Sequence, residues 1–161
     1  MDSAQLAWLQ SHLWILSGLY GCVRPFHAVE PYRLEMGAKL AVDDACDLYA
    51  FWDDKLARII APAGSNTTIV NLASVEYAKA VLPHLAADAT VVTCLFGEGV
   101  RNGKPIQRST ASKKARGSMV RWMAENKLED ASGLTAFDVG YRHAPELSNK
   151  NTLVFLNEQT L

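Results

Sequence analysis

The sequence has few of the features that mark disulfide-rich, zinc-binding, secreted or membrane proteins. Its three cysteines, Cys22, Cys46 and Cys94, form neither a CxxC pair nor a cluster with histidine, which argues against a disulfide framework or a zinc site. We interpret them as reduced thiols, most of them buried. No apolar run approaches the roughly 18 to 20 residues that cross a bilayer, and the N-terminus lacks the order of a secretory signal. These absences predict a cytoplasmic protein without membrane contact.

Metal-binding and catalytic patterns are scarce as well. The four histidines stand alone, with neither HxH nor HExxH spacing, so the sequence predicts no metal site, no cofactor and no catalytic residue. It also identifies no small-molecule ligand. A metal site built from residues far apart in the sequence remains the alternative, since a fold can bring distant residues together.

The sequence does have the makeup of one globular domain. It contains 161 residues, of which 49% are hydrophobic and 20% charged, and this is enough to bury a core. We see no internal repeat and no low-complexity linker. Residues 1–161 are therefore expected to form a single domain.

Charge is distributed unevenly along the chain. The formal net charge is −1, yet the stretch from Gly99 to Ala124, called the basic segment below, contains seven basic residues and no acidic one. The basic segment therefore carries +7 and the rest of the chain −8. A near-neutral total can hide two opposite local fields, and a polyanion meets the local one. The seven cations are Arg101, Lys104, Arg108, Lys113, Lys114, Arg116 and Arg121.

Hydrophobic spacing predicts four helices. Leucines three and four residues apart indicate an amphipathic helix over residues 3–16, with Ser3 as its N-cap. Glycines and prolines then predict a structured loop over residues 17–40. The other predicted helices are 47–60, 74–82 and 111–126. The last of these is expected to bury an apolar face and to turn its cations outward.

Short apolar and β-branched runs predict the strands. The dipeptide Asn102-Gly103 is a strong hairpin signal, because both positions of a two-residue hairpin turn favour residues that accept positive φ. It is expected to lead the chain into residues 104–110 and then into the last helix. The other predicted strands are a buried one at 67–72 and further ones at 89–96, 137–141 and 152–156.

Five blocks of the sequence are distinctive in their residues and in their order along the chain. They are LSGLYGCVRPF at 16–26, EPYRLEMGAKL at 30–40, LYAFWDDKL at 48–56, VNLASVEYAKAV at 70–81 and SKKARGSMVRWMAEN at 112–126. They span nearly the whole chain and are followed by LVFLN at 153–157. Together they resemble the YaaA-like family of bacterial peroxide-stress proteins.

The resemblance implies a mixed α+β fold in which helices flank a mixed β-sheet. It also implies binding to duplex or branched DNA through a positively charged cleft, and a role in surviving hydrogen peroxide alongside DNA repair. Family members are longer, so the resemblance covers their later two-thirds and lacks their N-terminal portion. The family's helix-hairpin-helix element is similar, in its first helix and hairpin, to residues 13–21.

The basic segment supplies the candidate nucleic-acid contacts. Its lysines and arginines would pair with phosphates rather than read bases, so binding should be largely independent of sequence and fall steeply with salt. A solvated surface patch is the alternative. The predicted contacts are Lys113, Lys114, Arg116 and Arg121, helped by Lys104 and Arg108.

Two other places are candidates for holding a phosphate. Arg24, Arg33 and Lys39 lie in the proline-bounded loop and could line a cleft, although Arg33 could instead pair with a neighbouring glutamate. Ser74 follows a predicted strand and opens a predicted helix, so it marks either an anion site at the helix N-terminus or a plain N-cap.

We therefore interpret the chain as a DNA-binding protein of the peroxide-stress response rather than an enzyme. One alternative is a metal-dependent enzyme acting on nucleic acid or nucleotides, with Glu35, Asp53 and Glu76 as its carboxylates. Another is a protein that limits intracellular free iron through carboxylates and histidines, because iron and peroxide together damage DNA.

Overall fold

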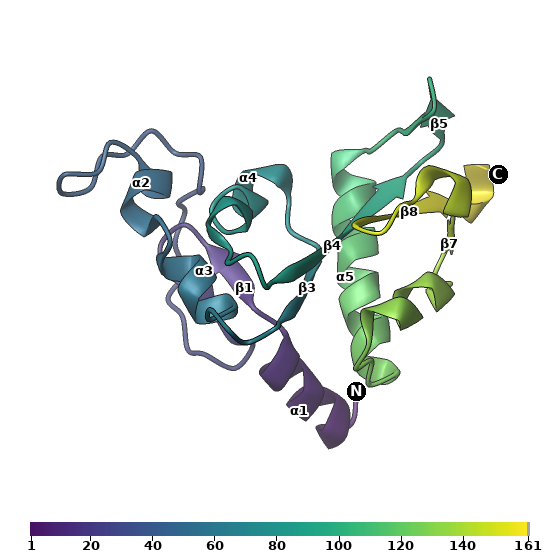
Figure 1. The fold of residues 1–161 in the computed structure, drawn as a ribbon, viewed down its shortest axis with the longest axis horizontal. Helices are drawn as coiled ribbons and strands as arrows, with labels where there is room; N and C mark the ends of the chain where they lie inside the picture. Colours follow the sequence, from purple (N-terminus) through teal and green to yellow (C-terminus); the bar gives the residue numbers. More distant parts are fainter. Residues whose placement is uncertain (161) are drawn as a thin grey trace. The chain divides into compact units, whose positions relative to one another are not determined.

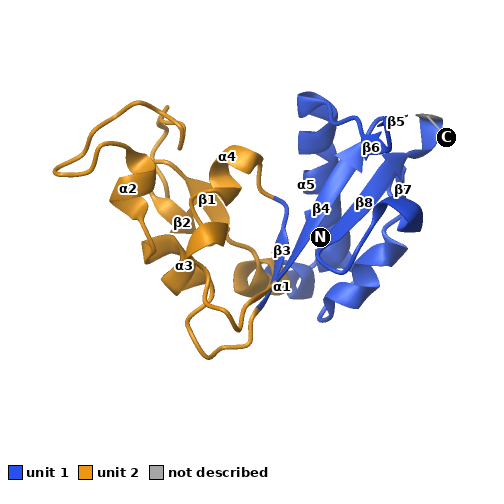
Figure 2. Cartoon of the chain, turned by 45° about the horizontal axis from the view of Figure 1, so that its top comes forward, with its two compact units in different colours: residues 1–6, 68–72, 91–161 blue, residues 7–67, 73–90 orange. Residues whose placement is uncertain are grey.

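The computed structural model describes residues 1–160, which form two compact units (Figure 2). Unit 1 comprises residues 1–6, residues 68–72 and the chain from residue 91 onward, and unit 2 comprises residues 7–67 and 73–90. That residues 1–161 form a single domain stays a prediction. No helix among the described residues combines the length and the apolar character needed to cross a membrane.

Unit 1 is built on a four-stranded sheet with the strand order β3-β4-β8-β7 (Figure 1). Strand β4 (Thr90–Gly97) runs parallel to β8 (Thr152–Asn157), and β7 (Tyr141–His143) pairs antiparallel with the other side of β8. Strand β3 (Thr68–Asn71) lies at the opposite edge. The predicted α+β fold, with helices flanking a mixed sheet, is therefore confirmed.

An aromatic core joins this sheet to helix α5 (Ser109–Glu125). Phe96, Phe155 and Met119 are fully buried in it, and the rings of Phe96 and Phe155 stack at 5.5 Å between centroids. Phe137 meets both rings edge to face, at 6.1 and 5.8 Å. Offset and edge-to-face contacts of this kind add to the free energy gained by burial, so the core holds β4, β8 and α5 together.

Unit 2 gathers short elements around a smaller core centred on Met36, Leu48 and Leu56. Helix α1 begins in unit 1 and ends in unit 2. The elements are α1 (Ser3–His12), the antiparallel pair β1 (Ile15–Ser17) and β2 (Gly21–Val23), α2 (Leu48–Trp52), α3 (Lys55–Ile60) and α4 (Val75–Ala78).

The helix predicted over residues 3–16 ends early, and the helix-hairpin-helix placement at 13–21 is wrong. Residues Ile15–Ser17 form a strand, and the chain turns back into β2 with Gly21 at φ +72°. A side chain at this glycine would also collide with Trp52 at 2.7 Å. Strand pairing overrides the leucine spacing here, because the pairing depends on a partner that local periodicity does not report.

Asp2, rather than Ser3, caps helix α1. Asp2 Oδ1 accepts a hydrogen bond from the Gln5 amide at 2.8 Å, and Gln5 Oε1 accepts one from the Asp2 amide at 2.9 Å. This reciprocal arrangement is a capping box, which satisfies two backbone donors at once. The N-cap prediction was therefore one residue late.

The helix predicted over 47–60 is two helices. Asp47 caps α2 by accepting from the Ala50 amide at 2.8 Å, but Asp53 adopts φ +44° and separates α2 from α3. A residue in this conformation cannot continue a right-handed helix. The helix predicted over 74–82 is likewise reduced to α4 and a short 3₁₀ helix.

The remaining differences concern strands and 3₁₀ helices. The strand predicted at 137–141 begins only at Tyr141, and the strand predicted as buried at 67–72 is a half-exposed edge strand. The strands predicted at 89–96 and 152–156 are confirmed. The 3₁₀ helices are η1 (Leu82–His84), η2 (Ala131–Ala136), η3 (Pro145–Leu147) and η4 (Glu158–Thr160).

Candidate nucleic-acid interface

The hairpin predicted at Asn102-Gly103 is confirmed. Strands β5 (Val100–Arg101) and β6 (Lys104–Pro105) pair antiparallel, and the two turn residues have φ +51° and +71°. Positive φ at both central positions matches the right-handed twist of the flanking strands. The register places Arg101 directly opposite Lys104 at the tip of the hairpin.

Helix α5 turns Lys113, Lys114 and Arg121 outward, as predicted. Ala115 and Met119 are buried against the sheet, and the buried hydroxyl of Ser112 donates to the carbonyl oxygen of Phe96 at 3.3 Å. Lys113 and Lys114 lie between these positions on the other side of the helix and are exposed. The helix is therefore held by its apolar side and presents lysines to solvent.

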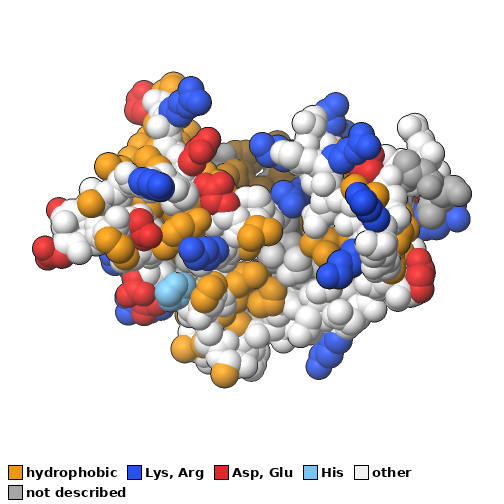
Figure 3. Space-filling model, turned by 90° about the horizontal axis from the view of Figure 1, so that it is seen from above, with side chains coloured by type: hydrophobic (Ala, Val, Ile, Leu, Met, Phe, Trp, Pro, Cys, Tyr) orange, Lys and Arg blue, Asp and Glu red, His pale blue; other side chains and the backbone are white. Residues whose placement is uncertain are grey.

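Five cations of the basic segment are exposed and form no ion pair with any residue from 1 to 160. They occupy the hairpin and the N-terminal half of α5, all within unit 1, and Figure 3 shows lysine and arginine side chains on this part of the surface, at the right of the view. They are Arg101, Lys104, Arg108, Lys113 and Lys114, called the free cations below.

Arg121 differs from the free cations. Its Nε lies 2.7 Å from Glu125 Oε1, one helical turn away, and both side chains are exposed. Exposed pairs of this kind contribute only about 0.2–1 kcal/mol, so a phosphate could displace the carboxylate. Arg121 is still a weaker candidate for phosphate binding, because it must first give up its partner.

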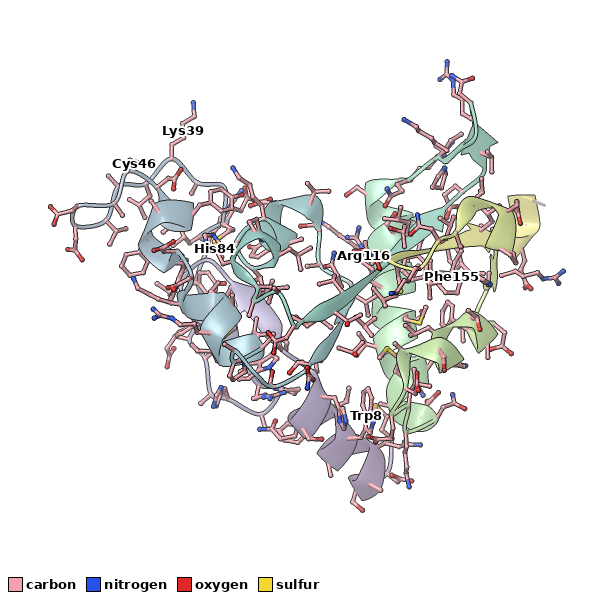
Figure 4. The ribbon with its side chains drawn as sticks, viewed as in Figure 1. Trp8, Lys39, Cys46, His84, Arg116 and Phe155 are labelled. Carbon is pink, nitrogen blue, oxygen red and sulfur yellow. The ribbon has the colours of Figure 1, made fainter. Side chains whose placement is uncertain are left out.

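Arg116 is only partly exposed on α5 (Figure 4). Its Nε is buried and has no hydrogen-bond partner within the described chain, and burial lowers the pKa of its guanidinium. An arginine keeps its charge despite such a shift. The side chain is therefore a positively charged group, partly held in place by burial, whose Nε–H has no protein acceptor among the described residues. It lies on the same helix as Lys113 and Lys114.

A carboxylate that sequence reasoning missed lies at the base of the hairpin. Glu98 follows β4, and its Oε1 accepts from the Tyr141 hydroxyl at 2.5 Å while its Oε2 accepts from Asn157 Nδ2 at 3.0 Å. The partners come from β7 and β8, 43 and 59 residues away, so no local pattern could have indicated them. Glu98 ties the start of the hairpin to the far side of the sheet.

Tyr141 gives this tie a measurable pH dependence. Burial, followed by its hydrogen bond to Glu98 and the charge of Glu98, raises the pKa of Tyr141 from 10 to about 12. Stability contributed by a raised pKa is present below the unfolded value and is lost between about pH 10 and 12. Denaturant titrations should therefore show a steeper alkaline loss of stability for the wild type than for Tyr141→Phe. Equal slopes would contradict the raised pKa of Tyr141.

The second group of predicted contacts lies in unit 2. Arg24 is engaged internally: its Nη1 donates to the carbonyl oxygens of Ser11 at 2.9 Å and Leu13 at 3.2 Å, and its guanidinium lies 3.6 Å from the ring centre of Trp14. This arginine closes the end of α1 through Nη1, and its guanidinium is held against Trp14, so a phosphate could use only the other N–H groups.

Arg33 and Lys39 are exposed in the segment between β2 and α2, and Figure 4 shows Lys39 on the outer part of that segment. Within residues 1–160, Arg33 forms no ion pair with Glu30 or Glu35. Ser74 occupies the N-cap position of α4 but makes no capping hydrogen bond through its side chain. A helix of four residues also has few aligned peptide dipoles with which to attract an anion.

The three carboxylates of the enzyme alternative are separated into two places. Glu76 Oε1 accepts from the Gly37 amide at 2.8 Å, and Glu76 and Glu35 both help to raise the pKa of Tyr77, after the larger effect of its burial. Asp53 instead lies 3.6 Å from His84 Nδ1. No group of three or more His, Cys, Asp or Glu suited to a metal ion occurs among the described residues.

The fold and the basic segment define a class: an α+β protein that carries an exposed cationic hairpin and helix on one of two compact units. A family described as "Peroxide stress protein YaaA" matches residues 1–147. The chain belongs to this peroxide-stress family.

Relatives with a similar sequence carry the name UPF0246 protein. The protein of Laribacter hongkongensis is 48% identical over 164 residues, covering 98% of this chain and 62% of the relative. That of Pediococcus pentosaceus is 44% identical over 160 residues, covering 99% of this chain and 62% of the relative. The chain thus spans about three-fifths of the length of these relatives.

Proposed function

We propose that this chain binds the phosphate backbone of duplex or branched DNA in the bacterial cytoplasm and protects DNA during hydrogen-peroxide stress. The observation that carries the proposal is the group of five free cations on the hairpin and α5. Cations without protein counter-charges keep their full attraction for a polyanion, whereas internally paired ones do not. The family description supplies the peroxide-stress context, and the free cations supply the ligand chemistry.

The N-terminal end of α5 supports an anionic ligand independently of side-chain charge. Arg108 occupies the N-cap position without making a capping hydrogen bond, so no capping side chain satisfies the first backbone N–H groups of this 17-residue helix. The first turn of α5 also carries no acidic side chain that could interact with the positive end of the helix dipole. A bound phosphate would accept hydrogen bonds from these amides and interact favourably with the dipole.

Salt dependence tests the proposal. Fluorescence anisotropy of a labelled duplex, titrated with the folded chain at several salt concentrations, should give a plot of log K against log[salt] with a slope of about −4 to −5 if all five free cations contact phosphates. Because most of the contacts are to phosphates, duplexes of different sequence should differ in affinity by no more than about tenfold. A folded chain that does not bind, or that binds with a slope near zero, would contradict phosphate contact.

A further inference from the structure

The tip of the β5–β6 hairpin carries an electrostatic cost that nothing in the described chain relieves. Arg101 and Lys104 are directly opposite each other, and neither is paired with a carboxylate within residues 1–160. Like charges across an antiparallel pair destabilise it. The two-residue turn at Asn102 and Gly103 holds the register that creates this contact. A ligand with negative charge would turn the repulsion into binding energy.

Both faces of the hairpin are open. Every residue from Val100 to Lys104 is exposed, and Ile106 beyond it is 40% exposed. No neighbouring atom lies within 4 Å of where a side chain would begin at Gly99 or Gly103. Figure 1 shows the hairpin extending beyond the sheet and the start of α5. The hairpin is therefore an arm that can be surrounded by a ligand on two sides.

The base of the arm is fixed. The Glu98 amide donates to the Ile106 carbonyl oxygen at 2.8 Å, and the Ile106 amide donates to the Gly99 carbonyl oxygen at 2.8 Å. A side chain at Gly97 would begin 2.8 Å from Pro105, so the arm packs closely on the end of β4. The hydrogen bonds from Tyr141 and Asn157 to Glu98 fix this same end of the hairpin. A fixed base lowers the entropy lost when the arm binds.

We propose that this arm enters the major groove of duplex DNA, with Arg101 and Lys104 at its tip. This inference rests on the proposed function and adds the groove that the protein occupies. The arm extends roughly 10 Å from its base, since each strand residue adds about 3.3 Å. That reach exceeds the depth of the major groove, about 8.5 Å, and a two-stranded ribbon fits its width of about 12 Å but not the minor groove's 6 Å or so.

The side chains of the arm suit that groove. Arginine and lysine donate to the N7 and O6 atoms of guanine, which the major groove exposes. Val100 and Ile106, 47% and 40% exposed, are apolar groups of the kind that contact the methyl group of thymine. Lys113 and Lys114 on α5 remain available for phosphates. The arm and the helix thus have separate roles, insertion and phosphate contact.

The test compares two duplexes of one sequence, one plain and one carrying glucosylated 5-hydroxymethylcytosine. The glucose fills the major groove and leaves the phosphate charge unchanged. We expect it to weaken wild-type binding by about tenfold, the scale of one lost base-edge contact. Arg101→Ala/Lys104→Ala, which removes the tip charges, should bind both duplexes within twofold of each other. Lys127→Ala/Lys150→Ala removes two exposed cations elsewhere in unit 1 and should discriminate like the wild type.

A third sample is the plain duplex saturated with the minor-groove ligand netropsin, whose two positive charges weaken phosphate binding for every variant alike; it should lower the affinities of wild type and tip variant by the same factor. Insertion of the arm into the major groove would be overturned by equal wild-type affinity for the two duplexes or by equal losses on glucosylation for wild type and tip variant. It would also be overturned if netropsin weakened the wild type more than the tip variant. Each of these outcomes would still be consistent with phosphate binding by the remaining cations. Failure of the folded wild type to bind either duplex would overturn the proposed function and the arm together.

Discussion

Reversing two lysine charges on α5, in the variant Lys113→Glu/Lys114→Glu, is expected to weaken DNA binding by about a hundredfold or more at moderate salt. The change removes two phosphate contacts and places two negative charges next to the backbone that the remaining free cations approach. The slope of log K against log[salt] should become less steep by about two, one unit for each lost contact. Anisotropy titrations at several salt concentrations measure both quantities.

The variant should fold normally, which makes a loss of binding interpretable. Both positions are exposed on the second turn of a 17-residue helix, and glutamate has a helix propensity close to that of lysine. Lys127→Glu/Lys150→Glu is the matched control, because it changes the net charge equally from exposed sites in unit 1. If both double variants lose affinity equally, net charge rather than the basic segment governs binding.

Replacing Phe155 by alanine is expected to lower the free energy of unfolding by about 3–5 kcal/mol. The side chain is fully buried in β8 (Figure 4). Its ring stacks on Phe96 at 5.5 Å between centroids and meets Phe137 edge to face at 5.8 Å. Truncation leaves a cavity among aromatic rings on strands that are fixed by the sheet, so collapse can fill it only partly.

Phe26 provides the comparison, because its side chain is 60% exposed. Phe26→Ala should change the free energy of unfolding by less than about 0.5 kcal/mol, the usual range for exposed positions. Denaturant unfolding followed by far-ultraviolet circular dichroism, with an unchanged m-value, measures both variants. Similar losses for the two phenylalanines would mean that the aromatic cluster is not the stabilising core of unit 1.

The hairpin and α5 could be predicted because their determinants are local. Asn102-Gly103 specifies a two-residue turn through the φ values that these residues accept, and the spacing of Ala115 and Met119 defines a buried helical face. The ion pair between Arg121 and Glu125 could also be predicted from the sequence, since residues four apart on a helix are neighbours. The basic segment ends at Ala124, one residue before this carboxylate.

Distant partners account for the features that the sequence did not reveal. Arg24 stays a predicted phosphate contact, but its Nη1 donates to the carbonyl oxygens of Ser11 and Leu13 once the chain folds back. The helix predicted over 3–16 stops because its last residues pair with β2. A three- or four-residue period describes the faces of a helix, yet it carries no information about a competing strand.

The sequence by itself determined the family, the uneven charge and the cationic hairpin and helix, because each depends on residue order or on interactions within a few positions. The tertiary structure decided which cations are free, which are paired, and how the hairpin is held at Glu98 by Tyr141 and Asn157. Those outcomes depend on burial and on hydrogen bonds between residues up to 59 positions apart. Such contacts exist only after the strands have assembled, because chain folding brings their partners within hydrogen-bonding distance.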